Sequence, residues 1–222
     1  EVALAAGGFP PLRGGKWGVA RIALGQLFLG RAIDRFKPSP PGSFDPEALE
    51  FLDVSWSLGL SFMAIDPIFG YQVFSGNLRM ALKVGEPARV ARALYFRAFL
   101  MEMSGAQGAK VQRLLKQAEA YGAGIDHAPG VEARWMFLAI SKSMGGDFEG
   151  AIGEGERALQ ALETSPGKTT HALGVIQGLK QSNLYWLGRL QELRDQWNSN
   201  ADLHRLRGDR YGLSHVTSQF GW

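Results

Sequence analysis

The chain has 222 residues, of which 45% are hydrophobic and 20% charged, so it can bury a sizeable core and is too apolar for a disordered protein. It has no cysteine, which excludes disulfide bonds, thiolate catalysis and the usual structural zinc sites. The net charge is only +3, and the arginines are scattered along the chain. We therefore expect a cytoplasmic protein that does not bind nucleic acid.

Residues 1–43 are predicted to form a separate N-terminal segment, rich in Gly and Pro, with one apolar helix and a linker. The apolar stretch Trp17–Gly30 has 14 residues and contains Arg21, whereas a membrane-spanning helix needs about 20 apolar residues. Three prolines within residues 37–42 then prevent the helix from continuing and predict the linker. Because the chain opens on Glu and shows no secretory signal, we expect it to be a piece of a longer protein.

Residues 44–222 carry repeated helix signals and almost no strand signals. Asp45-Pro46 and Asp66-Pro67 each place a capping acid before a proline at the first helical position, and Glu86-Pro87 opens a further helix. The pattern predicts an all-α fold of eight or nine helices. One begins at residue 46, and others extend over 68–84, 87–103, 109–121, 131–144, 148–164, 170–187 and 190–206.

The glycines that end three of these helices are evenly spaced. Gly105, Gly146 and Gly188 are 41 and 42 residues apart, a length that two helices and two turns fill. A helical hairpin of this kind buries both of its faces only when it stacks on neighbouring hairpins. The spacing therefore predicts that residues 44–222 form a tetratricopeptide-like (TPR-like) α-α superhelix with a period of about 41 residues.

Three stretches resemble one family, the C-terminal TPR-like helical-repeat region of large bacterial Ser/Thr protein kinases of the myxobacterial and planctomycete type. The stretches are residues 52–68, residues 74–94 and residues 185–212, and the most specific is the run Ala-Leu-x-x-Gly-Glu-Pro-x-Arg-Val-Ala-Arg-Ala-Leu at residues 81–94. The resemblance implies a kinase domain, often with an ATPase module, ahead of an array that senses or scaffolds. It also implies that this chain ends before the array does.

No catalytic motif of a kinase occurs in this chain, which lacks a G-x-G-x-x-G loop, H-R-D and D-F-G. Lys16 follows two glycines, but a phosphate loop needs a glycine where Pro10 stands and Ser or Thr where Trp17 stands. We therefore predict a non-enzymatic protein-interaction or ligand-sensing module without cofactor or metal, which binds a protein, a peptide or another domain of the same polypeptide on its concave face. Two alternatives remain. One is a helical effector domain of a LuxR-like or MalT-like ATPase regulator; the other is an all-helical lipid or terpenoid enzyme, for which the acidic D-D-x-x-D motif is missing.

Several polar residues are candidates for chemistry, and each also has a structural interpretation that we favour. Histidines without ligand spacing are expected on the surface or at helix caps: His127, His171, His204 and His215. Arg207-Gly208-Asp209 is expected to end one helix and cap the next, although the tripeptide also occurs in adhesion proteins. The sequence therefore designates no catalytic, metal-binding or ligand-binding residue.

Clustered charges and aromatic side chains allow the same two interpretations. Three arginines could form a basic face for a phosphate group, but salt bridges between helices are the favoured reading of Arg89, Arg92 and Arg97. Glu154 and Glu156 lie on different helix faces and do not form a catalytic pair. Three aromatic residues could line a groove, but core packing is the simpler expectation for Tyr95, Trp135 and Tyr185.

Overall fold

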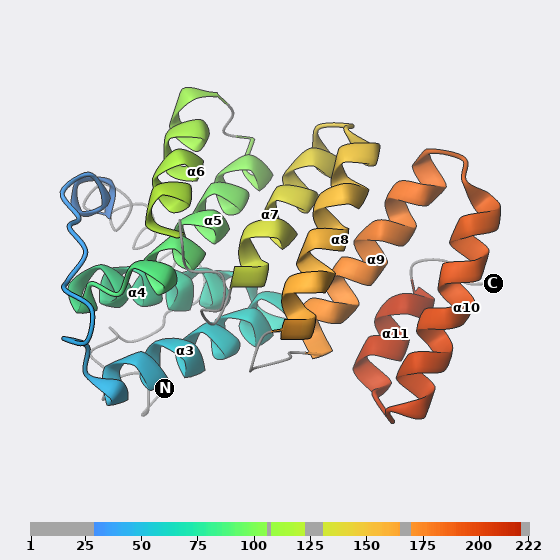
Figure 1. The fold of residues 1–222 in the computed structure, drawn as a ribbon, viewed down its shortest axis with the longest axis horizontal. Helices are drawn as coiled ribbons and strands as arrows, with labels where there is room; N and C mark the ends of the chain where they lie inside the picture. The colour runs from blue at the N-terminus through green and yellow to red at the C-terminus, as the bar shows by residue number, and fades with distance from the viewer. Residues whose placement is uncertain (1–28, 106–107, 123–130, 165–169, 219–222) are drawn as a thin grey trace. The chain divides into compact units, whose positions relative to one another are not determined.

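The computed structural model describes residues 29–105, 108–122, 131–164 and 170–218 (Figure 1). Every regular element within these ranges is helical, which confirms the predicted all-α class for this part of the chain. Residues 29–34 are helical, and the rest of the helix predicted over residues 17–30 lies outside the described ranges. None of the described helices is both long enough and apolar enough to cross a membrane.

The helix boundaries agree closely with those expected from the sequence. The helices are α3 (Pro46–Ile65), α4 (Pro67–Val84), α5 (Pro87–Met103), α6 (Ala109–Gly122), α7 (Val131–Met144), α8 (Phe148–Thr164), α9 (Thr170–Trp186), α10 (Leu190–Leu206) and α11 (Arg210–Ser218). Only α11 was not among the helices whose ranges were predicted. The boundary between residues 43 and 44 stays a prediction, because residues 1–28 lie outside the described part.

Acidic side chains cap the first three of these helices, as the Asp-Pro and Glu-Pro pairs predict. Asp45 Oδ1 accepts a hydrogen bond from the Glu47 amide at 3.2 Å, and Asp66 Oδ1 accepts from the Ile68 amide at 3.0 Å. Glu86 caps α5 through both carboxylate oxygens, which accept from the backbone amides of the second and third helical residues. Each cap satisfies amides that the first turn of a helix leaves without a partner.

Glycines with positive φ end four helices of the chain. Gly105, Gly146 and Gly188, the residues whose spacing defines the predicted period, have φ values of 80°, 83° and 71°, and Gly208 after α10 has 64°. The residue after Gly188 donates its amide to the Leu184 carbonyl at 2.9 Å, the longer of the two hydrogen bonds of a Schellman motif. The same bond follows Gly146 and Gly208. Three of the turns are therefore built alike.

Replacing Gly188 by Ala is expected to lower the free energy of unfolding by about 1–2 kcal/mol, because a side chain disfavours the left-handed conformation. No atom lies within 4 Å of the added Cβ, so the cost comes from the backbone alone. Urea unfolding followed by circular dichroism measures it. Gly153→Ala is the matched control: that glycine lies inside α8 with equally open space, and its replacement is expected to stabilise by about 0.5–1 kcal/mol. Equal effects of the two substitutions would contradict the assignment.

The chain divides into two compact units. One comprises Glu1–Leu94 with Gln117–Tyr121, and the other comprises Tyr95–Lys116 with Gly122–Trp222. In the first unit α3 packs against α4, and the ring of Trp56 meets that of Phe74 edge-on at 4.9 Å between centroids.

A buried amide joins the same two helices. The fully buried Asn77 of α4 donates one hydrogen bond to the Leu52 carbonyl and one to Ser55 Oγ of α3, both at 2.8 Å. This side chain therefore satisfies polar groups inside an apolar interface, where leaving them unpaired is costly.

In the second unit, helices that follow one another in the chain pack together. α7 packs on α8, α8 on α9, α9 on α10 and α10 on α11. Alternate helices also touch, since α9 contacts both α7 and α11. Figure 1 shows these helices, coloured yellow to red, running in alternating directions. Close to α7, Phe96 and Phe99 of α5 pack on Phe137, with ring centroids 5.2 and 5.4 Å apart.

Candidate functional site

The arginines of α5 are structural. Arg89 binds Asp53 of α3 through two hydrogen bonds, one of them from Nε at 3.1 Å, and Arg92 Nη2 reaches the same carboxylate at 2.9 Å. The Arg92 guanidinium also lies 4.5 Å from the centre of the Trp56 ring. Arg97 is buried as well. The three side chains do not form an exposed basic face, and the salt-bridge interpretation is confirmed for Arg89 and Arg92.

The electrostatics of Arg89 follow from this pairing. Burial by itself would lower the pKa of Arg89, but hydrogen bonds and charge attraction from Asp53 and Glu86 outweigh burial and raise the pKa above its ordinary value. The guanidinium is therefore charged under all physiological conditions. Its role is to hold α3 and α5 together in the first unit.

The two glutamates of α8 also act separately, as predicted. Glu154 is buried and accepts from Lys142 at 2.8 Å and from Arg157 at 3.1 Å. Glu156 lies on the exposed side and pairs with Lys180 of α9 at 2.7 Å. Among the described residues, no three His, Asp or Glu side chains cluster in a way that could hold a metal ion.

His204 is a correction to the expectation that the histidines lie on the surface or at caps. Its side chain is completely buried; Nδ1 lies 2.9 Å from Asp209 Oδ2, and Nε2 lies 2.8 Å from Gln177 Oε1. The carboxylate accepts from Nδ1, and the amide of Gln177 can present either its oxygen or its nitrogen to Nε2. The ring therefore ties α9, α10 and the start of α11 together. The side chains of the other three histidines lie outside the described residues.

Arg207-Gly208-Asp209 has the structural role that was predicted. Gly208 takes the left-handed conformation after α10, and Asp209 Oδ1 accepts the Gly212 amide at 2.9 Å, which caps α11. The second carboxylate oxygen of Asp209 is the one that meets His204. Both oxygens of this side chain therefore serve the fold.

The aromatic side chains divide into buried and exposed ones. Tyr95 belongs to the core, as expected, but core packing is wrong for Tyr185, which is 47% exposed. Tyr185 meets the more exposed Trp186 edge-on at 5.6 Å between ring centroids, and Trp186 stacks on Phe148 at 6.3 Å. We call Phe148, Tyr185 and Trp186 the aromatic cluster. It lies where α9 ends and α8 begins, and large exposed aromatic groups of this kind mark binding surfaces.

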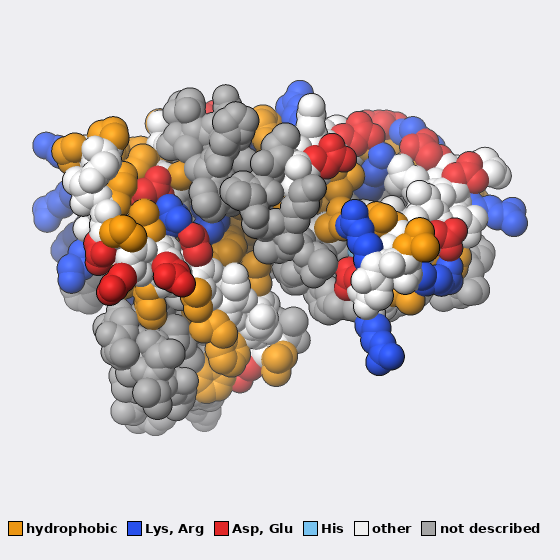
Figure 2. Space-filling view, turned by 60° about the horizontal axis from the view of Figure 1, so that its bottom comes forward, with side chains coloured by type: hydrophobic (Ala, Val, Ile, Leu, Met, Phe, Trp, Pro, Cys, Tyr) orange, Lys and Arg blue, Asp and Glu red, His pale blue; other side chains and the backbone are white. Residues whose placement is uncertain are grey.

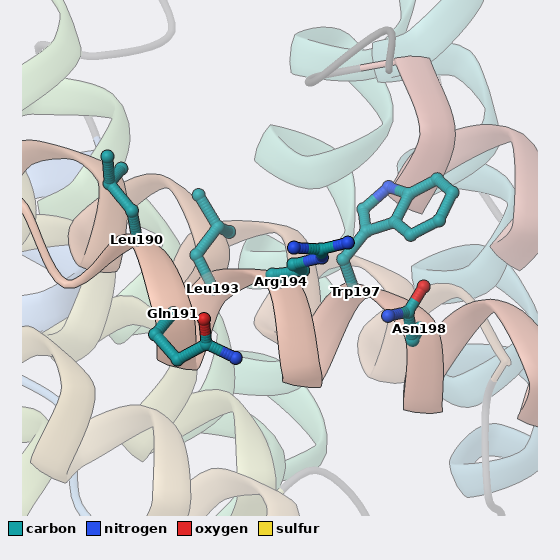
Figure 3. A pocket seen from close by; sticks show the side chains of 6 residues that line it. All are labelled: Leu190, Gln191, Leu193, Arg194, Trp197 and Asn198. Atoms are coloured by element: carbon teal, nitrogen blue, oxygen red, sulfur yellow. The ribbon is translucent and has the colours of Figure 1, made fainter.

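A pocket of about 580 Å³ lies on the N-terminal half of α10, immediately after this cluster in the chain. The α10 pocket is lined by Leu190, Gln191, Leu193, Arg194, Trp197 and Asn198 (Figure 3). They recur at helical spacing, so one side of a single helix supplies them. Leu193 is buried in a core cluster with Leu184 and Ile152, which fixes the inner wall, whereas Leu190 is 55% exposed at the rim.

The polar groups of the α10 pocket are mostly hydrogen-bond donors. Arg194 forms no ion pair with another described residue, and Trp197 Nε1 is buried with no acceptor among the described residues. Figure 3 shows the Arg194 guanidinium and the nitrogen edge of Trp197 turned toward one another. Gln191 uses its amide nitrogen on Asp195 at 3.1 Å and keeps its oxygen for the pocket. A pocket with an apolar floor and convergent donors can hold a ligand that brings an acceptor.

A second hollow of about 690 Å³, on α3 of the first unit, has fewer groups left to use. Its charged pair, Asp53 and Arg89, is engaged in the salt bridge described above. The hydroxyls of Ser57 and Ser61 donate to carbonyls of their own helix at 3.2 and 3.1 Å. The α10 pocket is therefore the stronger candidate.

The surface carries no large area of one charge on the face that Figure 2 shows. Lys and Arg side chains alternate with Asp and Glu side chains in small groups over the described residues. On α10 itself, Arg189 pairs with Glu149 at 3.1 Å and with Glu192. Charge alone therefore does not select a partner, and the local chemistry of the pocket has to.

The sequence contained two signals for this site. Tyr185 and Trp186 are adjacent at the last turn before Gly188, where one of them must face away from the core. Leu190, Leu193 and Trp197 then recur at intervals of three and four residues in an otherwise polar helix, an apolar stripe. The stripe indicated burial, and no pattern indicated that part of it stays open.

The described part of the chain is thus an all-α protein whose second unit presents an aromatic cluster beside a donor-lined pocket. Comparisons with protein-family models, with curated proteins and with solved structures find no match. The resemblance to kinase-associated repeat regions therefore stays a prediction.

Proposed function

We propose that this chain is a non-catalytic protein-interaction module built of stacked helical hairpins, a TPR-like superhelix with a period of about 41 residues. Two features support the architecture: the left-handed glycines at residues 146 and 188 end equivalent helices, and α9 contacts α7 on one side and α11 on the other. Contacts between alternate helices are what stacked hairpins require.

One observation carries the interaction function. Trp186 is 66% exposed and is held between Phe148 and Tyr185, next to Leu190 at the rim of the α10 pocket. Rigid, exposed aromatic side chains beside a concave apolar site are the residues that dominate binding energy in protein interfaces. An extended peptide segment with apolar side chains fits this surface.

Binding of short random peptides tests the proposal. Peptides displayed on phage are selected on the full chain, and each selected peptide is titrated against the wild type, Trp186→Ala and Leu206→Ala by fluorescence anisotropy. Leu206 is the matched control, because it is equally apolar and 87% exposed at the other end of α10. We expect Trp186→Ala to weaken binding at least about tenfold and Leu206→Ala to change it by less than about twofold.

Two results would contradict the interaction function. One is a selection that yields no binding peptide; the other is binding that Trp186→Ala leaves unchanged. Circular dichroism of the variants verifies that they fold, and the exposure of both side chains makes unfolding an improbable outcome.

The link to signalling kinases is part of the same proposal and rests on the sequence resemblance. It predicts that a Ser/Thr kinase domain is encoded ahead of this segment in the same reading frame, with this module coupling partner binding to kinase activity. The reading frame of the parent gene tests it. A LuxR-like or MalT-like ATPase regulator in that position would favour the alternative.

A further inference from the structure

We propose that the α10 pocket binds a carboxylate group attached to an apolar body. The carboxylate would lie between the Arg194 guanidinium and Trp197 Nε1–H, and the apolar body would lie on Leu190 and Leu193. This inference rests on the proposed interaction function and adds to it the chemistry of the bound group.

The first argument is the convergence of donors. Arg194 presents only N–H groups and Trp197 presents only one, so neither can satisfy the other. They are turned toward one another in Figure 3, and neither has an acceptor among the described residues. An indole N–H that is buried without an acceptor is unfavourable, and a group that accepts from both donors removes this cost. A carboxylate does so with two oxygens and also neutralises the guanidinium charge.

The second argument is a polar layer between α9 and α10. Two contacts fix the antiparallel register: Leu184 packs with Leu193, and Gln177 meets His204. Gln181 lies between Leu184 and Gln177 on α9, and so faces the turn of α10 that holds Trp197.

Gln181 is completely buried, and both polar atoms of its amide lack a partner among the described residues. Native proteins rarely leave such a group unpaired. Gln181 and Trp197 Nε1 together leave this layer with donors and an acceptor to spare, which is the state expected of a binding site without its ligand.

The apolar half of the pocket defines the rest of the ligand. Leu190 and Leu193 project to the same side of α10 in Figure 3, next to the two donors. A short aliphatic group beside the carboxylate would cover them. The C-terminal residue of a peptide and an acidic side chain next to an apolar one both have this chemistry, and so does a free apolar acid.

The test uses the indole N–H signals of the full chain in ¹⁵N nuclear magnetic resonance spectra. The six tryptophans report separately, and Trp197→Phe identifies the signal of Trp197. N-acetyl-L-leucine is the probe, and N-acetyl-L-leucinamide, which lacks the charge, is its matched control. We expect the Trp197 signal to move on titration with the acid, with a Kd on the order of 1 mM, and the amide to bind at least about tenfold more weakly.

Two substitutions test the role of the guanidinium. Arg194→Gln is expected to weaken binding of the acid at least about tenfold, whereas Arg113→Gln, which removes the same charge from an exposed position on α6, is expected to change it by less than about twofold. Arg194 is exposed, so the variant is expected to fold, and unchanged signals of the other tryptophans verify this.

Peptides distinguish the sources of the carboxylate. Acetyl-Ala-Leu with a free C-terminus presents a terminal carboxylate, and acetyl-Leu-Glu-Leu amide presents a side-chain one. Tighter binding of either peptide than of N-acetyl-L-leucine indicates a protein ligand of that type, and equal binding of all three indicates a free acid.

The proposal is overturned if the acid and the amide bind alike, if Arg194→Gln retains binding, or if no probe moves the Trp197 signal. Those results leave the proposed interaction function intact where selected peptides still depend on Trp186. Loss of that dependence, by contrast, removes the interaction function and leaves carboxylate binding by the pocket to stand on the titration.

Discussion

Replacing Asp53 by Ala is expected to lower the free energy of unfolding by about 3 kcal/mol. The Asp53 carboxylate serves Arg89 and Arg92, whose side chains are only 11% and 5% exposed. Without it, Arg92 keeps its contact with the Trp56 ring but loses its counter-charge, and Arg89 keeps only Glu86. An uncompensated charge at a buried position costs about 3–5 kcal/mol, and the lower end applies because Asp53 itself is 34% exposed.

The control for Asp53 is Asp202 of α10, which also pairs with an arginine, Arg205, at 2.8 Å. Both of those side chains are more than half exposed, so Asp202→Ala is expected to change the free energy of unfolding by less than about 0.5 kcal/mol. Asp53→Asn keeps the shape but not the charge and is expected to destabilise almost as much as Asp53→Ala. Equal effects at positions 53 and 202, measured by urea unfolding, would show that the network on α3 does not stabilise the fold.

Replacing His204 by Ala is expected to destabilise the protein by about 3–4 kcal/mol. The substitution empties a fully buried volume and leaves both of its polar partners, Gln177 and Asp209, without the ring. Because Asp209 also caps α11, we expect that helix to lose protection first. Amide hydrogen exchange of residues 210–218, compared with that of α7 and α8, measures this local effect.

Gly212→Ala attacks the same contact from the other side. An added Cβ would lie 2.1 Å from His204 Nδ1 and 2.5 Å from the Asp209 carboxylate, so the ring or the cap has to move. Overpacking of this kind is expected to cost about 1–3 kcal/mol. If both Gly212→Ala and His204→Ala leave exchange in α11 unchanged, the histidine does not hold this helix.

Much of the local structure could be predicted from the sequence, because its determinants lie within a few residues. The Asp-Pro pairs at residues 45 and 66 predicted two helix starts, and the structure shows the carboxylates on the expected amides. Gly188 predicted a helix end and has the left-handed conformation that makes it one. Capping and φ preferences depend on neighbouring residues alone, so one sequence suffices to read them.

The candidate site could not be predicted in the same way. Tyr185 and Trp197 look like core residues in the sequence, since aromatic side chains at helical spacing are usually buried. Whether such a side chain is covered depends on which helix packs against it, and helices far apart in the chain decide that. His204 shows the opposite error: its partner Gln177 is 27 residues away, and nothing near the histidine announces it.

The sequence by itself determined the all-helical class, the ends of most helices and the structural role of Gly208 and Asp209, because these depend on short-range preferences. Only the tertiary structure decided that Asp53 receives two arginines, that His204 is buried, and that Arg194 and Trp197 are left facing a pocket with no acceptor among the described residues. Those outcomes depend on the packing of helices against one another, which gives each side chain its exposure and its partners.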